Sequence, residues 1–202
     1  MKKSITKTSD ENIRCNLDKW MTSASPENWT KGRYWYRDAQ DYCKDLSNEF
    51  DINPYICASV VSCLSPNNKW QRNKIDARAV IIAHLNGINP ESVKVCTYTA
   101  NKLKAFRVLQ DGEKIASTAP KTHAFAMNCG LLSNNHITID KWHIRACLSL
   151  PGCGIIDCVE TITSAQYRRV EAITAGLAKI HNLKGYQFQA IIWLTIKENW
   201  NR

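Results

Sequence analysis

Long hydrophobic runs are missing from this sequence of 202 residues, and no stretch approaches the roughly 18 apolar residues that a membrane-spanning helix needs. Glycine and proline are few, at 8 and 6 residues, and neither recurs at a fixed period, which excludes collagen-like and low-complexity classes. Residues 1–14 lack the apolar stretch of a secretory signal. Hydrophobic residues make up 44% of the chain, which is enough to form a buried core. We therefore expect a folded intracellular protein without membrane contact.

The nine cysteines do not follow the pattern of a disulfide framework, because their number is odd, their spacing is irregular and no export signal precedes them. Cys147, Cys153 and Cys158 form the one group worth weighing as a metal site. Their intervals match neither the paired cysteines of zinc ribbons nor a four-thiolate iron–sulfur cluster. We therefore expect reduced thiols, no metal site and no cofactor.

Charge is unevenly balanced, with 27 lysines and arginines against 18 acidic residues and a formal net charge of +9. A positive excess of this size favours association with polyanions, of which nucleic acid is the commonest. Charge alone leaves the partner open, because many basic proteins bind no nucleic acid.

Apolar residues recur at steps of three and four through most of the chain, and no pair of alternating strands with a hairpin turn is present. Asn53-Pro54 is typical of a helix cap followed by proline at the first helical position, and Ser65-Pro66-Asn67-Asn68 is typical of a turn. The sequence predicts an all-α protein with a polar N-terminal arm over 1–16 and a single helical domain over 17–202. The expected helices cover residues 33–50, 55–64, 69–86, 99–110, 120–132, 140–149, 164–180 and 187–198.

The segment 120–150 carries the residues of greatest chemical interest. Lys121 stands at the start of an expected helix, where burial and the helix dipole both disfavour the ammonium and favour a nucleophilic amine. Asp140 stands at the entrance of the next expected helix, where a carboxylate keeps its charge and can accept a proton or stabilise a developing cation. The alternative is structural: Asp140 serves as a helix cap and Lys121 extends its ammonium to solvent.

Lys121-Thr122, Ile139-Asp140 and Arg145 follow one another in an order and at a spacing that resemble the active region of the helix-hairpin-helix (HhH-GPD) DNA glycosylases of the endonuclease-III type. Further pieces match in order over roughly residues 50–200, although each is short. These pieces are Asn53-Pro54-Tyr55 through Leu64-Ser65, the segment from Lys102 to Leu109, and Gln189 to Leu194. The resemblance implies an all-α glycosylase-like fold with two helical lobes around a cleft, in which residues 65–150 carry the site.

The sequence departs from the family pattern at the hairpin. The glycine-containing run before the family's lysine, whose backbone amides hold a DNA phosphate, is replaced by Ile115 to Pro120, which contains no glycine. The resemblance therefore implies a shortened or degenerate hairpin. The C-terminal iron–sulfur cysteines are absent as well, since the last cysteine is Cys158, and Trp142 replaces the family's histidine.

Carried over to this sequence, the resemblance implies a base-excision reaction on double-stranded DNA. Lys121, activated by Asp140, would attack C1′ of a flipped nucleotide, expel a modified or damaged base, and leave a Schiff base from which elimination cuts the strand. We expect a monomer in the cytoplasm, associated with the nucleoid. The residues expected to contact DNA are Asn67, Asn68, Lys69, Arg72, Lys102, Lys141, Trp142 and Arg145.

Three other functions stay open at this point. A glycosylase-like fold can serve an enzyme that modifies pyrimidines in DNA rather than removing them, and a displaced hairpin fits such a divergent branch. The chain can also be a DNA-binding module without catalysis, in which case binding would be salt-sensitive and indifferent to Lys121 and Asp140 beyond the loss of one charge. A helical protein with no nucleic-acid role is the fourth possibility.

Overall fold

The computed structural model describes residues 2–112, 115, 118–130, 136–153 and 158–200. All secondary-structure elements of three or more residues in this part of the chain are α- or 3₁₀-helices. The all-α prediction is confirmed for this part of the chain. The one isolated bridge there joins Lys3 and Cys158 in parallel, with the Val159 amide donating to the Lys3 carbonyl at 2.9 Å. Among the described residues, no helix combines the length and apolarity needed to cross a bilayer.

The chain divides into two compact units, which we call the terminal unit (Met1–Arg37 with Asn134–Arg202) and the central unit (Asp38–Ser133). The expectation of one domain over 17–202 that consists of two helical lobes stays a prediction. Helix α2 (Pro26–Phe50) contributes its first residues, to Arg37, to the terminal unit and the rest to the central unit.

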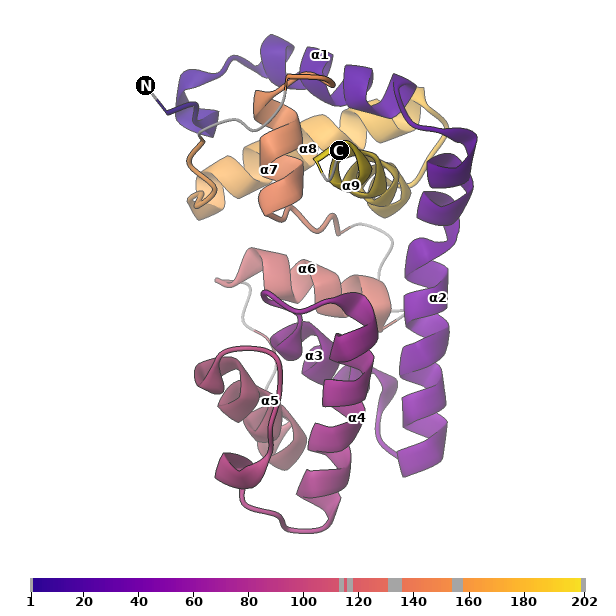
Figure 1. The fold of residues 1–202 in the computed structure, drawn as a ribbon, viewed down its shortest axis with the longest axis vertical. Helices are drawn as coiled ribbons and strands as arrows, with labels where there is room; N and C mark the ends of the chain where they lie inside the picture. Colours follow the sequence, from indigo (N-terminus) through magenta and orange to yellow (C-terminus); the bar gives the residue numbers. More distant parts are fainter. Residues whose placement is uncertain (1, 113–114, 116–117, 131–135, 154–157, 201–202) are drawn as a thin grey trace. The chain divides into compact units, whose positions relative to one another are not determined.

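Besides the first residues of α2, the terminal unit contains four helices, and Figure 1 shows three of them beside the C-terminal helix α9. Its core contains Phe188, Ile191 and Ile192 of α9, all fully buried. Gly32 of α2 lies so close to Ile191 that a β-carbon there would stand 2.6 Å from the Ile191 Cα, so only glycine permits this approach. The helices are α1 (Asp10–Thr22), α7 (Lys141–Leu148), α8 (Ser164–Ile180) and α9 (Gly185–Trp200).

The N-terminal region differs from the polar arm expected over 1–16. Ile5, in the short 3₁₀ helix η1 (Ile5–Lys7), and Ile13, in α1, are buried in the core of the terminal unit. Helix α1 contacts α7, α8 and α9. Two residues of the expected polar arm therefore contribute to this core, although widely spaced aliphatic side chains in a polar stretch give no periodic signal in the sequence.

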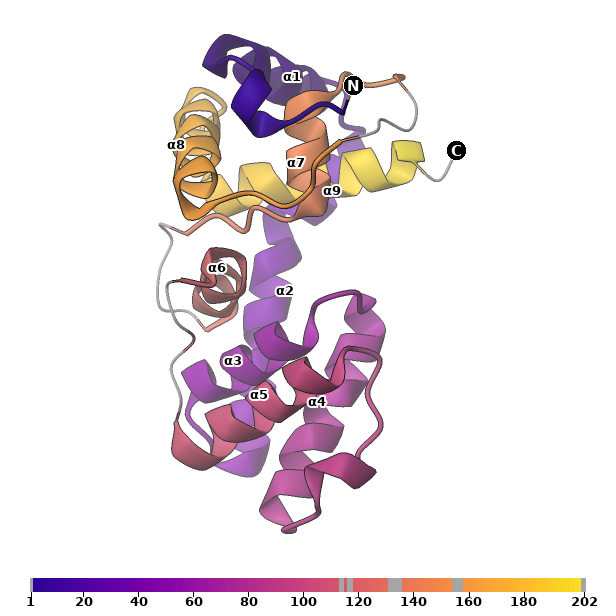
Figure 2. The same cartoon turned by 90° about the vertical axis from the view of Figure 1, so that its left-hand side faces the viewer.

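The central unit is built around α3 (Pro54–Leu64), whose residues from Cys57 to Leu64 are all buried. Figure 2 shows α3 together with α4 and α5, and α3 also packs against α6. The remaining elements of this unit are α4 (Trp70–Leu85), the 3₁₀ helix η2 (Pro90–Ser92), α5 (Thr99–Asp111) and α6 (Pro120–Cys129).

Local sequence rules account for several helix ends. The Asn53 side chain accepts the Tyr55 amide at 2.8 Å and Pro54 occupies the first turn of α3, as the sequence predicts. Helix α5 ends at Gly112, whose φ of 62° is left-handed. Helix α6 ends at Cys129, earlier than expected, and residues 131–135 lie outside the described part of the chain. Of the expected hairpin region, Ile115 to Pro120, residues 116 and 117 lie outside it too.

Candidate functional site

The residues singled out from the sequence fall into both units. The central unit contains Asn67, Asn68, Lys69, Arg72, Lys102 and Lys121, and the terminal unit contains Asp140, Lys141, Trp142 and Arg145. The pairing of Lys121 with Asp140 stays a prediction.

Lys121 is the second residue of α6, and its side chain is half-buried. No side chain caps the start of this helix. The Ser62 hydroxyl donates to the Thr122 carbonyl at 2.7 Å, so the first turn of α6 lies against the last turn of α3. Among the described residues, the Lys121 ammonium has no hydrogen bond or ion pair. The structure thus places a primary amine at a helix start without a fixed internal partner.

Asp140 is the N-cap residue of α7 and accepts the His143 amide on its carboxylate at 2.9 Å. The capping alternative raised from the sequence is therefore confirmed for this residue. Capping does not exclude chemistry, because a carboxylate has more lone pairs than one cap uses.

His143 sits directly beneath this cap and is completely buried, a position that sequence reasoning missed. Its Nε2 lies 2.9 Å from the Thr174 hydroxyl, which itself donates to the Val170 carbonyl at 2.8 Å. Because that hydroxyl proton is already used, Nε2 carries the imidazole proton and donates it. Nδ1 is buried without a partner in the described part of the chain. Burial lowers the pKa of His143 to about 3, so the ring is neutral at physiological pH.

The three α7 residues expected to contact DNA are arranged as a stack. The Arg145 guanidinium lies 4.6 Å from the centre of the Trp142 ring, and the Lys141 ammonium lies 5.8 Å from it. Arg145 also donates from Nε to the Glu160 carboxylate at 2.7 Å. Trp142 itself packs against the core of the terminal unit. Arg145 and Trp142 thus have structural partners, and exposed Lys141 is the member of this group best placed for a phosphate contact.

Lys102 was expected to contact a DNA phosphate, but its side chain is buried. Its ammonium donates to the Val93 carbonyl at 2.8 Å and approaches the Glu91 carbonyl at 3.5 Å. A helical charge pattern predicts a solvated face, but here the neighbouring loop covers the side chain. Lys102 holds that loop and is not available to DNA.

The turn after α3 contains the two candidate asparagines. Asn67 has a left-handed φ of 57°, and its exposed side chain donates to the Tyr98 hydroxyl at 2.6 Å. Asn68 is partly buried and donates to the Asp76 carboxylate at 2.9 Å. Lys69, the N-cap residue of α4, is exposed. The turn therefore presents Asn67 and Lys69 outward while Asn68 points inward.

Asp76, which sequence reasoning did not single out, is the centre of this region. Its carboxylate is buried and accepts from the Arg72 Nε at 2.7 Å and from the Cys96 backbone amide at 2.8 Å, in addition to Asn68. Arg72 is thus paired within its own helix. A polar residue between two apolar helical positions gives no sign in the sequence that it is buried.

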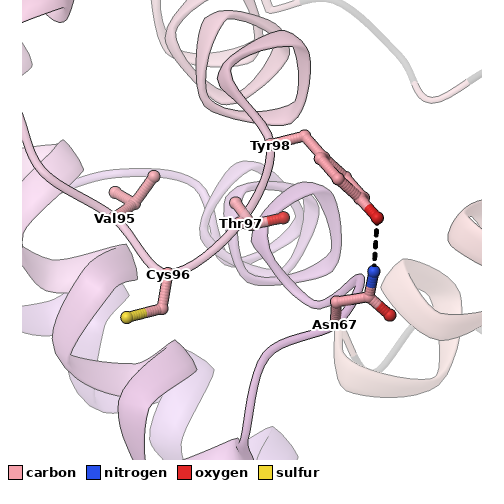
Figure 3. Close-up of a pocket in the computed structure, with 5 residues that line it drawn as sticks. All are labelled: Asn67, Val95, Cys96, Thr97 and Tyr98. Atoms are coloured by element: carbon pink, nitrogen blue, oxygen red, sulfur yellow. Dashed lines mark hydrogen bonds between the residues drawn. The ribbon is translucent and has the colours of Figure 1, made fainter.

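A hollow of about 360 Å³ opens beside the turn, lined by Asn67 and by the consecutive residues Val95, Cys96, Thr97 and Tyr98 (Figure 3). Tyr98 is 62% exposed, so much of its ring is open to solvent. Figure 3 shows its hydroxyl directed at the Asn67 amide. The hollow thus combines one aromatic ring and one amide with a largely apolar floor.

Buried thiols belong to the core of the central unit. Burial raises the pKa of Cys57 to about 12, and burial together with the neighbouring Cys43 raises the pKa of Cys129. Thiols held protonated in this way are poor nucleophiles and poor metal ligands. Across the part of the chain that is described, no three or more His, Cys, Asp or Glu side chains gather as a metal site would require.

Positive charge is concentrated in the terminal unit, a division that becomes visible only once the units are known. That unit has 16 lysines and arginines against 9 acidic residues, a net charge of +7, whereas the central unit has 11 against 9, a net charge of +2. The terminal unit therefore has the stronger general attraction for a polyanion.

Comparisons with known proteins give one family and no individual relative. Neither the curated proteins nor the solved structures contain a match to this chain. A family model does match, over residues 1–200. The chain belongs to this family, DUF7178, a family of unknown function.

Proposed function

We propose that this protein is a DNA glycosylase with AP lyase activity, in which Lys121 is the nucleophile and Asp140 the activating carboxylate. The observation that supports the proposal is that the Lys121 side chain is half-buried and its amine has no hydrogen bond or ion pair among the described residues. Of the cations that the sequence singles out, Arg72 and Arg145 are paired with carboxylates and Lys102 is buried on carbonyl oxygens. Lys121 is half-buried at a helix start, with no such partner among the described residues. A partly desolvated amine without a partner suits nucleophilic attack.

Base release begins at the Lys121 amine. The neutral Nζ forms a bond to C1′ of a flipped nucleotide, and the glycosidic bond breaks with its electron pair leaving on the base, which takes up a proton. Asp140 accepts the proton that the amine releases. Opening of the sugar ring gives an iminium ion, and loss of a C2′ proton with departure of the 3′ phosphate cuts the strand.

The test is reductive trapping with borohydride on a panel of duplexes. The duplexes contain uracil, oxidised pyrimidines, oxidised guanine, alkylated bases or a bare abasic site. The intact protein should form a covalent adduct with at least one of these duplexes, and Lys121→Ala should form none. The matched control is Lys44→Ala, which removes the same charge from an exposed position of the central unit and should trap normally. Normal trapping by Lys121→Ala would refute the assignment.

Asp140→Asn separates the chemical from the structural role of Asp140. Asparagine is as good an N-cap as aspartate, so α7 should keep its start and the protein its stability. The carboxylate is lost, however, and base release should fall by roughly 100-fold or more, the usual contribution of a positioned acid or base. Wild-type rates in this variant would leave Asp140 as a cap only.

A DNA-binding module without catalysis is the second candidate, and the net charge of +7 on the terminal unit favours it. It predicts duplex binding whose affinity falls steeply with salt and no trapped adduct on any substrate. The enzyme that modifies pyrimidines would instead leave a heavier intact nucleoside, which mass spectrometry of digested DNA detects.

A further inference from the structure

Two segments far apart in the sequence are joined at the buried carboxylate of Asp76. We call them the asparagine turn (residues 65–69) and the tyrosine loop (residues 93–98). In the asparagine turn, the Asn68 side-chain amide donates to Oδ2 of Asp76 at 2.9 Å. In the tyrosine loop, the Cys96 backbone amide donates to the same oxygen at 2.8 Å. The Arg72 guanidinium balances the charge from the other oxygen. The partner in each of these three contacts with the carboxylate is thus a hydrogen-bond donor.

Further contacts fix the tyrosine loop on both flanks. The Thr97 hydroxyl donates to the Pro66 carbonyl at 2.9 Å, which is a second link to the asparagine turn. On the other flank, the buried Lys102 ammonium holds the Val93 carbonyl at 2.8 Å. A buried acid and a buried amine from two neighbouring helices therefore hold a loop that has no regular structure beyond η2.

Burying two charged groups is expensive, and apolar side chains of similar size stabilise a fold at least as well. What these charges supply is a defined geometry, because each hydrogen bond fixes a direction as well as a distance. The fixed positions of the two segments place Asn67 beside Tyr98, where the two side chains are hydrogen-bonded and line the hollow (Figure 3).

An exposed aromatic ring beside an amide has the chemistry that recognises an unpaired nucleobase. The ring supplies a stacking surface, and the amide supplies one donor and one acceptor for the edge of a base. Both groups lie at the surface, since Tyr98 is 62% exposed and Asn67 is also exposed. The hollow beside them is lined mainly by apolar atoms of Val95 and its neighbours, as a planar ring requires.

We propose that Asp76 is a positioning residue that holds the asparagine turn and the tyrosine loop together, so that Tyr98 and Asn67 present one rigid surface to an unpaired base of DNA. This inference rests on the proposed function, because it takes DNA as the substrate, but it does not depend on the nucleophile. Asp76 contacts no DNA itself and acts through Asn68 and the Cys96 amide.

The experiment uses a duplex with 2-aminopurine opposite a stable abasic-site analogue, whose fluorescence reports how that base is stacked. Binding of the intact protein should change the fluorescence. Tyr98→Ala should weaken binding by roughly 5- to 150-fold, the effect of losing one stacked base, and should abolish the change. Tyr98→Phe should keep most of the change, because the ring remains and only its bond to Asn67 is lost.

Asp76→Asn tests the positioning role at saturating protein, where weaker binding does not contribute. The Asp76→Asn variant should bind the duplex but give little of the wild-type fluorescence change. Its side-chain amide would place a donor against the donor of Asn68 or Cys96, and one of the two segments would lose its hydrogen bond. The matched control is Glu49→Gln, which breaks the surface ion pair with Arg78 in the same unit and should behave as wild type. Asn68→Ala is the milder second variant, for use if Asp76→Asn does not fold, and should show the same loss.

The outcomes separate this inference from the proposed function. A full fluorescence change in Asp76→Asn and Asn68→Ala, or in Tyr98→Ala at saturation, overturns the inference while leaving Lys121 trapping untouched. A change that depends on Asp76 and Tyr98 without any trapped adduct supports the inference and overturns the glycosylase assignment. Absence of DNA binding by the intact protein overturns both.

Discussion

The buried histidine beneath the Asp140 cap makes stability depend on pH in a way that can be calculated. The pKa of His143 is lowered by burial to about 3, whereas in the unfolded chain it has the ordinary value of about 6.5. The native state therefore keeps the ring neutral, and the unfolded state gains a proton below pH 6.5. This contribution to stability is fully present above pH 6.5 and is lost as the pH falls towards about 3.

The magnitude follows from the proton balance. One pKa unit corresponds to about 1.36 kcal/mol, so between pH 7 and pH 5 the free energy of unfolding should fall by about 2 kcal/mol because of His143 alone. His143→Gln keeps a donor for the Thr174 hydroxyl and removes the titration. The variant should therefore lose about 2 kcal/mol less than the wild type over this range.

The assay is urea unfolding at pH 7, 6 and 5, followed by tryptophan fluorescence. Six of the seven tryptophans lie in the terminal unit, so the signal reports mainly on the unit that contains His143. The matched control is His84→Gln in α4 of the central unit, which should follow the wild type. If the wild type and His143→Gln lose stability in parallel, the ring is not buried as a neutral group and the reasoning about α7 is refuted.

Packing and charge give further predictions. Gly32→Ala should lower the free energy of unfolding by about 1–3 kcal/mol or more, because the new β-carbon would meet Ile191 at 2.5 Å, and urea unfolding measures this. Gly176→Ala in α8 should instead be neutral or raise it by up to about 1 kcal/mol, since its β-carbon would lie 3.5 Å from Arg14, an ordinary contact; a loss comparable to that of Gly32→Ala would contradict this packing. Lys102→Met should leave the salt dependence of DNA binding unchanged, because the ammonium is already bound to loop carbonyls, and a shallower salt slope would show that it contacts phosphate.

Whether a candidate residue can be recognised from the sequence depends on how far away in the sequence its partners lie. Lys121 and Asp140 could be chosen from the sequence, because each stands at a helix start that local residues define. Asp76 could not, since the groups that make it important arrive from residues 68 and 96. Arg145 matches the family's arginine and has a charge that predicts a phosphate contact, whereas its pairing with Glu160 appears only in the folded chain.

The amino-acid sequence by itself determined the helical class and most helix boundaries, because periodicity, caps and turns act over a few residues, as at Asn53 and Gly112. The tertiary structure alone decided which polar side chains are buried and which segments meet. It placed Ile5 and Ile13 in a core, covered Lys102, and joined the asparagine turn to the tyrosine loop. The physical reason is that burial and long-range hydrogen bonds depend on neighbours distant in sequence, and no local pattern records them.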